Sequence, residues 1–191
     1  MMSKGSSDDI QAFIELLLSP QREKELDPFF VITFLPIEPH HEVADIGCGP
    51  GFFTVPLAKH LLHGKVYAMD VLEEMLEAVS RRVAQVNLSN VEINKCNPTD
   101  FPIPDVSLDG VLLAFVTHYN EEPVEFLKAV RNLLRNTGWC GVLEYYKKES
   151  QDGPPLEKRI DPEELRNFAQ QAGFQFREWR DINGKQYMAV L

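Results

Sequence analysis

The sequence is poor in positive charge. Its 191 residues include 19 lysines and arginines against 29 aspartates and glutamates, which gives a formal net charge of -10 at pH 7. Affinity for nucleic acid comes largely from neutralising phosphates with basic side chains, so this composition disfavours a nucleic-acid partner. A small-molecule partner fits better, and no pattern in the sequence specifies an oligomeric state.

Other features are missing as well. The three cysteines, Cys48, Cys96 and Cys140, have no paired spacing, which predicts reduced thiols. Histidines, cysteines and acids form no cluster with ligand spacing, which predicts no metal site. No apolar run approaches the roughly 20 residues of a membrane span, and the polar residues 1–9 predict no signal peptide. We therefore expect a cytoplasmic protein without a membrane partner.

What the sequence does contain is a glycine turn between a predicted strand and a predicted helix. Residues 43–54 read VADIGCGPGFFT, with glycines at positions 47, 49 and 51. Glycines there let the backbone pass close under a ligand. A dinucleotide fingerprint would need a further glycine where Phe52 stands, and the phosphate-binding pattern G-x-x-x-x-G-K-[ST] does not occur. Asp45, two residues before the first glycine, favours a cationic ligand instead.

This stretch resembles the first motif of class I S-adenosylmethionine-dependent methyltransferases, which is an acid, one residue, and then G-x-G-x-G. Asp70 supports the resemblance because it ends the next apolar run, 19 residues beyond Gly51. In nucleotide-binding units an acid at about 20 residues meets a ribose hydroxyl. The resemblance extends over most of the chain from about Ser19, and its specific motifs lie between Val43 and His118. It implies S-adenosyl-L-methionine as the cofactor and in-line methyl transfer to an unidentified, small-molecule acceptor.

The resemblance also assigns roles to residues at the carboxyl ends of the strands, where open α/β sheets bind ligands. The glycine turn would hold the amino-acid end of the cofactor, and Asp70 its ribose. The Asn97 amide would contact the adenine, and the carboxylate of Asp100 is the alternative. The full expected cofactor set is Asp45, Gly47, Cys48, Gly49, Gly51, Asp70, Val71, Met75, Asn97 and Phe115.

His118 is the candidate catalytic residue, because it follows the fourth predicted strand where the methyl group should lie. A lone histidine is more often structural, and that alternative stays open. A base is needed only when the acceptor is a weakly acidic hydroxyl or carbon acid. Good nucleophiles need only alignment and exclusion of water.

The strand and helix patterns predict a single α/β domain. Apolar runs from residue 43 and at 64–70, 91–96, 109–116 and 139–146 alternate with helical patterns, and Asn183-Gly184 indicates a closing hairpin. We expect a three-layer αβα sandwich around a mostly parallel, seven-stranded Rossmann-like sheet with an antiparallel C-terminal hairpin. Residues 1–36 would form a helical cover, with one helix ending at Pro20 and another over 29–35, and residues 37–191 the Rossmann-like core.

Two other functions stay open from the sequence alone. One is a non-catalytic module that binds the cofactor without transferring its methyl group. The other is a nicotinamide-dependent oxidoreductase, which Phe52 and the terminal hairpin disfavour. The polar loop 147–160 is long enough to suggest function. Its cations could pair with an anionic acceptor or simply be solvated; they are Lys147, Lys148, Lys158 and Arg159.

Overall fold

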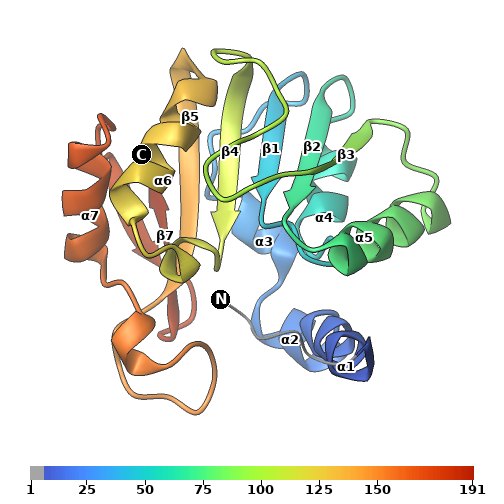
Figure 1. Ribbon diagram of the computed structural model, residues 1–191, viewed down its shortest axis with the longest axis horizontal. Helices are drawn as coiled ribbons and strands as arrows, with labels where there is room; N and C mark the ends of the chain where they lie inside the picture. The colour runs from blue at the N-terminus through green and yellow to red at the C-terminus, as the bar shows by residue number, and fades with distance from the viewer. Residues whose placement is uncertain (1–6) are drawn as a thin grey trace.

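A seven-stranded sheet forms the middle layer of the protein in the computed structural model, which describes residues 7–191 (Figure 1). The strands lie in the order β3-β2-β1-β4-β5-β7-β6. Strands β1 to β5 are parallel, and β7 is antiparallel to both β5 and β6. Their bounds are β1 Glu42–Ile46, β2 Lys65–Asp70, β3 Val91–Lys95, β4 Leu108–Ala114, β5 Leu134–Tyr145, β6 Glu178–Asp181 and β7 Gln186–Val190. The predicted fold class is confirmed.

Helices cover both faces of this sheet. Two neighbours on β4 show the division, because successive side chains of a strand point to opposite faces. Leu112 packs with the first group of helices and Leu113 with the second, and both are fully buried, as expected for a central parallel strand. The first group is α3 Pro28–Ile32, α4 Thr54–His60 and α5 Glu73–Gln85; the second is α6 Pro123–Leu133 and α7 Pro162–Gln171.

The connection from β3 to β4 contains no helix. Residues 96–107 are rich in proline and form turns, as the sequence indicates. Phe101 and Ile103 nevertheless pack against the core on the α6 and α7 face, and the Phe101 ring lies 6.5 Å from the Phe126 ring. This loop therefore covers the part of the sheet that a helix would otherwise cover.

The N-terminal segment forms two helices where one was predicted. Pro20 does not simply end α1 (Ser7–Leu17) but also begins α2 (Pro20–Glu25). The Ser19 hydroxyl caps α2 by accepting from the Arg22 N–H, and proline suits the first turn because its missing N–H is not needed there. The next helix, α3, ends at Ile32, short of the predicted Leu35. Three successive i to i+3 hydrogen bonds tighten the chain into a turn there.

The helices α1 and α2 and the loop that follows β5 lie at one end of the sheet (Figure 1). The parallel strands point their carboxyl ends toward this side. α1 packs on α5 through Ile14, Met75 and Ala78, so it crosses beside the glycine turn. No helix in the described part of the chain is both long and apolar enough to cross a bilayer.

The contact between Gly110 of β4 and Trp139 of β5 offers a test of sheet packing. A Cβ added at Gly110 would lie 2.2 Å from the Trp139 indole, so the strands pair closely only because position 110 has no side chain. We expect Gly110→Ala to lower the free energy of unfolding by about 1–3 kcal/mol in urea denaturation. In a Trp139→Leu background the same change should cost clearly less, and equal costs in both backgrounds would contradict this explanation.

Candidate functional site

The glycine turn after β1 has the backbone that a close-fitting ligand requires. Gly47, Gly49 and Gly51 all have positive φ, at 70°, 52° and 85°. An added Cβ would overlap Val116 at position 47 and Val79 at position 51, both within 2.7 Å. Among the described residues not adjacent in sequence, a Cβ at Gly49 would have only Leu17 of α1 within 4 Å, at 3.8 Å. The turn is therefore tightly packed at both ends and open at its centre.

Asp70 connects this turn to β2. Its Oδ2 accepts the Gly49 N–H at 2.8 Å, and its Oδ1 accepts the Leu72 N–H at 3.0 Å. Burial raises the pKa of this carboxyl above its usual value even though these backbone hydrogen bonds lower it. Each carboxylate oxygen can accept a second hydrogen bond, so Asp70 is both fixed in position and able to accept from hydroxyls of a ligand.

Asp45 is a second buried acid beside the same turn. It is 1% exposed and accepts the Thr54 Oγ1–H at 2.6 Å. Burial raises its pKa to about 7, and the neighbouring charge of Asp70 adds to the rise. Within residues 7–191, no lysine, arginine or histidine forms an ion pair with either acid. The site therefore holds two acids that no cation of the described residues pairs with directly.

The residues expected around an adenine differ widely in exposure. Val71 is 47% exposed, whereas Met75 is buried beneath α1. Asn97 and Asp100 lie on one exposed turn, where the Asn97 amide donates to the Asp100 carboxylate at 3.4 Å. The two candidates for the adenine contact are therefore neighbours on one turn.

A buried histidine–glutamate pair lies beyond β4. His118 belongs to a single 3-10 turn, Thr117–Tyr119, and its Nδ1 is 2.8 Å from Oε2 of Glu144 on β5. The other carboxylate oxygen accepts the His118 backbone N–H at 3.3 Å. The side chains of His118 and Glu144 are 2% and 0% exposed. Glu144 was missed from the sequence, where its only signal is an acid inside the apolar run 139–146.

This pair leaves one imidazole nitrogen available. A carboxylate can only accept, so Nδ1 carries the proton that it donates to Glu144, and in the neutral imidazole Nε2 then carries a lone pair. His118 Nε2 and the neighbouring Thr117 Oγ1 are buried without a hydrogen-bond partner in the described part of the chain. Buried polar atoms are nearly always paired, so such orphans mark a place for a ligand group or a water molecule.

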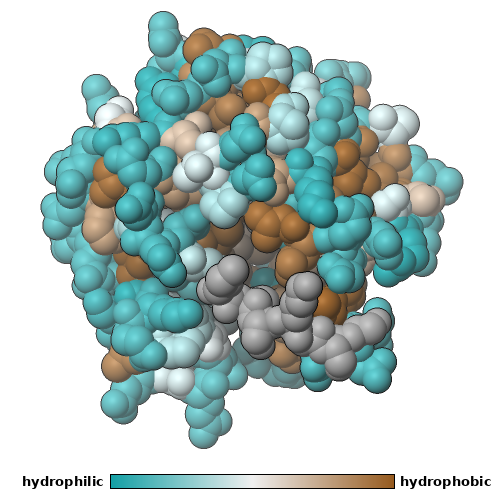
Figure 2. All heavy atoms as spheres, viewed as in Figure 1, coloured by the Kyte–Doolittle hydropathy of each residue, from teal (hydrophilic) through white to brown (hydrophobic). Residues whose placement is uncertain are grey.

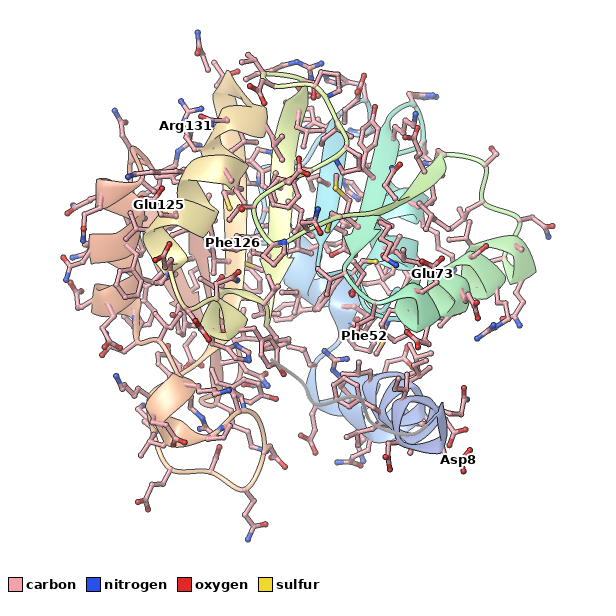
Figure 3. All side chains as sticks on the ribbon, viewed as in Figure 1. Asp8, Phe52, Glu73, Glu125, Phe126 and Arg131 are labelled. Atoms are coloured by element: carbon pink, nitrogen blue, oxygen red, sulfur yellow. The ribbon has the colours of Figure 1, made fainter. Side chains whose placement is uncertain are left out.

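Aromatic side chains lie at the carboxyl ends of β1, β4 and β5. Phe115, directly after β4, has a positive φ of 60°, and its ring lies 5.0 Å from the Tyr145 ring. Phe52 lies between the lower end of the sheet and α2 in Figure 3, and the Arg22 guanidinium is 4.3 Å from its ring. Figure 2 shows the molecule from the same side as Figure 1, with hydrophobic residues near the middle and hydrophilic residues around most of the periphery.

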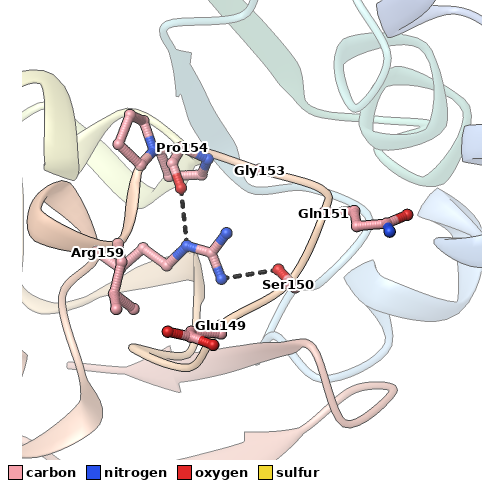
Figure 4. Close-up of a pocket in the computed structure, with 8 residues that line it drawn as sticks. Glu149, Ser150, Gln151, Gly153, Pro154 and Arg159 are labelled. Atoms are coloured by element: carbon pink, nitrogen blue, oxygen red, sulfur yellow. Dashed lines mark hydrogen bonds between the residues drawn. The ribbon is translucent and has the colours of Figure 1, made fainter.

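Two cations of the loop after β5 already have partners within the protein. The buried Arg159 guanidinium donates to the carbonyl oxygens of Pro154, Lys148 and Asp152 and to the Ser150 hydroxyl (Figure 4). Lys147 pairs with Glu164 of α7 at 2.9 Å. A hollow of about 670 Å³ lies here, but residues 149–159 of the loop alone line it. It is an opening within one loop rather than a meeting point of catalytic elements.

One exposed group of side chains outside this region has metal-ligand spacing. Among the described histidines, cysteines and acids, Glu38, His40 and His41 place one ligand atom each within 4.8 Å of one another. His41 Nδ1 already accepts the Glu38 N–H at 3.2 Å. The expectation of no metal stays a prediction.

Taken together, the turn and its two acids suit a ligand with a cationic centre and a sugar diol. A sulfonium or ammonium group would supply the positive charge that Asp45 and Asp70 lack, and hydroxyls could donate to Asp70. A pyrophosphate would instead be repelled by the two carboxylates.

Comparison with known proteins agrees with this chemistry. Residues 44–142, more than half of the chain, match a family described as "Methyltransferase domain". The demethylmenaquinone methyltransferase of Geobacillus stearothermophilus is 28% identical over 115 residues, which cover 60% of this chain and 49% of that protein. The Listeria monocytogenes enzyme of the same name is 25% identical over 73% of this chain and 57% of its own length. The chain thus spans about half the length of these relatives.

A solved structure is similar over nearly the whole chain. The SAM-dependent methyltransferase from Aquifex aeolicus superposes with a TM-score of 0.88 at 28% identity, covering 94% of this chain and 96% of that one. This agreement decides against the nicotinamide-dependent oxidoreductase that the sequence had left open. The chain therefore belongs to the methyltransferase-domain family.

Proposed function

We propose that this enzyme methylates a small molecule and that His118 removes the proton of the acceptor. The observation that carries the proposal is the buried pair with Glu144, which fixes the ring and leaves Nε2 as a base without a protein partner. An acid that orients a histidine in this way also stabilises the imidazolium formed when the proton arrives. The acceptor would then be a hydroxyl or an acidic carbon that must lose a proton to react.

The remaining residues of the site would position the cofactor, which supplies an electrophilic methyl group on a sulfonium. In this proposal Gly47, Cys48, Gly49 and Gly51 form the cradle, Asp45 faces the cationic end and Asp70 accepts from the ribose. Val71, Met75, Asn97 and Phe115 would line the rest. Holding donor and acceptor in line and excluding water can supply much of the rate enhancement.

Three observations support a small acceptor over a macromolecular one. The net charge is -10. Arg159 and Lys147, which could have formed a basic groove, are occupied by carbonyl oxygens and by Glu164. The curated relatives are named for methylation of demethylmenaquinone, which is a small molecule. Residues 7–36 would serve as a cover over the cofactor; residues 1–6 of the expected cover lie outside the described residues.

Substitution of the buried pair tests the proposed base. With demethylmenaquinone and a panel of phenols as acceptors and radiolabelled methyl donor, we expect His118→Gln to lower kcat roughly 10²- to 10⁴-fold, the usual contribution of a general base. Glu144→Gln should lower kcat as well and change its pH profile, because the ring loses its orienting acid. Binding of the methyl donor should stay unchanged in both variants. Full activity of His118→Gln on every accepted substrate would contradict the proposal.

Substitution of Asp70 tests the ribose contact. Asp70→Ala should weaken binding of S-adenosylhomocysteine by about 1.5–3 kcal/mol in calorimetry, the usual size of a hydrogen bond to a charged group. Glu73→Ala is the matched control, since Glu73 begins the next helix but is exposed and pairs with Lys95. Equal affinities for Asp70→Ala and the wild type would rule out this contact.

The raised pKa of Asp45 predicts opposite effects on stability and on binding. Because its folded pKa of about 7 exceeds the ordinary value, the folded protein keeps a proton that the unfolded chain releases, and the unliganded protein loses stability as pH rises from about 4 to 7. Asp45→Asn removes this loss and can still accept from Thr54. It should therefore raise stability at pH 8 by an amount on the order of 1–4 kcal/mol, with little change at pH 4.5.

The same Asp45→Asn variant should bind S-adenosylhomocysteine more weakly at pH 8, because the neutral amide no longer attracts an ammonium group. Thermal unfolding without ligand at the two pH values, together with calorimetry, gives both readouts. A stability gain of the same size at pH 4.5 and pH 8 would show that the ionisation of Asp45 is not its cause.

A further inference from the structure

Arg22 is a basic side chain beside the site that forms no ion pair with an acid of residues 7–191. Arg82 also lacks such a pair, but only Arg22 of these two lies against aromatic rings. Its guanidinium lies between two aromatic rings, 4.3 Å from the centre of Phe52 and 5.7 Å from that of Phe115. The one hydrogen bond that it donates goes from Nη1 to the Leu17 carbonyl oxygen at 2.8 Å. Arginines 81, 135, 166 and 180, by contrast, each pair with an aspartate or glutamate.

This arrangement leaves most of the hydrogen-bonding capacity of Arg22 unused. A guanidinium has five N–H donors in a planar fork, and the described residues accept from only one of its nitrogens. The side chain is partly buried, and burial lowers its pKa while the Tyr145 hydroxyl raises it. Residues 1–6, outside the described part, contain no aspartate or glutamate. A partly buried charge of this kind gains most from an anion that accepts two parallel hydrogen bonds.

The position of Arg22 connects it to the proposed ligand site. Phe52 directly follows the glycine turn, Phe115 follows β4, and Leu17 is the residue nearest to the open centre of the turn at Gly49. All three lie at the carboxyl edge of the sheet, where Asp45 and Asp70 supply only negative charge. A ligand that carries both a cation and an anion would meet complementary charge on both sides.

We propose that Arg22 is the anion-binding residue of this site and forms a bidentate pair with a carboxylate of the bound ligand. The inference rests on the proposed ligand site. The carboxylate has two possible sources, the amino-acid end of the cofactor or an acidic acceptor. Either source would make Arg22 a determinant of ligand specificity, contributed by a helix outside the matched methyltransferase-domain region.

Calorimetry with a matched pair of ligands tests the first source. S-adenosylhomocysteine carries the amino-acid carboxylate, and 5′-methylthioadenosine lacks it. If the cofactor supplies the anion, Arg22→Met should weaken S-adenosylhomocysteine roughly 10- to 100-fold and leave methylthioadenosine within about twofold. Arg22→Lys should fall between, because it keeps the charge but loses the fork.

A second titration tests the acceptor as the source. Benzoate and its neutral analogue benzamide are titrated into protein saturated with S-adenosylhomocysteine and followed by ligand-observed NMR. If the acceptor supplies the anion, Arg22→Met should abolish the preference for benzoate and leave affinity for S-adenosylhomocysteine unchanged. Arg82→Met is the control for both titrations, since Arg82 is also partly buried beside the glycine turn, where it donates to the Pro50 carbonyl oxygen.

The outcomes separate the inference from the proposed base. Loss of affinity confined to carboxylate ligands supports the role of Arg22. The ligand that loses affinity, S-adenosylhomocysteine or benzoate, then identifies the source of the carboxylate. Equal effects on charged and neutral ligands in both titrations, or none at all, overturn it, while the His118 and Asp70 variants still test the proposed function independently. Methionine retains the apolar packing against Phe52, and circular dichroism with thermal unfolding verifies that each variant is folded.

Discussion

The chemistry of the proposed site depends on two acids that are buried beside one glycine turn and that no cation of the described residues pairs with directly. Asp45 and Asp70 are both raised in pKa by burial, so the unliganded fold holds them at a cost. The turn makes this possible, because Gly49 donates its N–H to Asp70 and the Thr54 hydroxyl donates to Asp45. Such a site gains stability when a cationic ligand arrives, and this links the fold to the sulfonium chemistry of the family.

The site is divided between elements that come from different parts of the chain. β1, β2 and the turn between them supply the acids, and the ends of β4 and β5 supply the histidine–glutamate pair. The N-terminal helices supply apolar cover and Arg22. The hollow in the loop after β5 stands apart, because Arg159 satisfies the carbonyl oxygens of that loop and leaves no converging groups in it.

The sequence predicted the parts of this arrangement that depend on local signals. The glycine turn, the spacing of Asp70 and the alternation of strands and helices each depend on neighbouring residues, and the sheet has the predicted seven strands with an antiparallel C-terminal pair. Glu144 could not be found this way, because it lies 26 residues after His118 and contacts it only once β4 and β5 have paired. Pro20 was read as a helix end, which concealed α2 and with it Arg22. The loop cations appeared available because their carbonyl and carboxylate partners are set by tertiary folding.

The region that matches the family divides the site in an informative way. Residues 44–142 contain Asp45, the three glycines, Asp70 and His118, whereas Arg22 and Glu144 lie outside it. In the proposed function, the matched region therefore contains the glycine turn and both acids of the cofactor site. A histidine without its glutamate has no fixed tautomer, and a cradle without its cover is open to water. If His118 is the base that we propose, its orientation thus depends on Glu144 in one flanking segment, and Arg22 comes from the other.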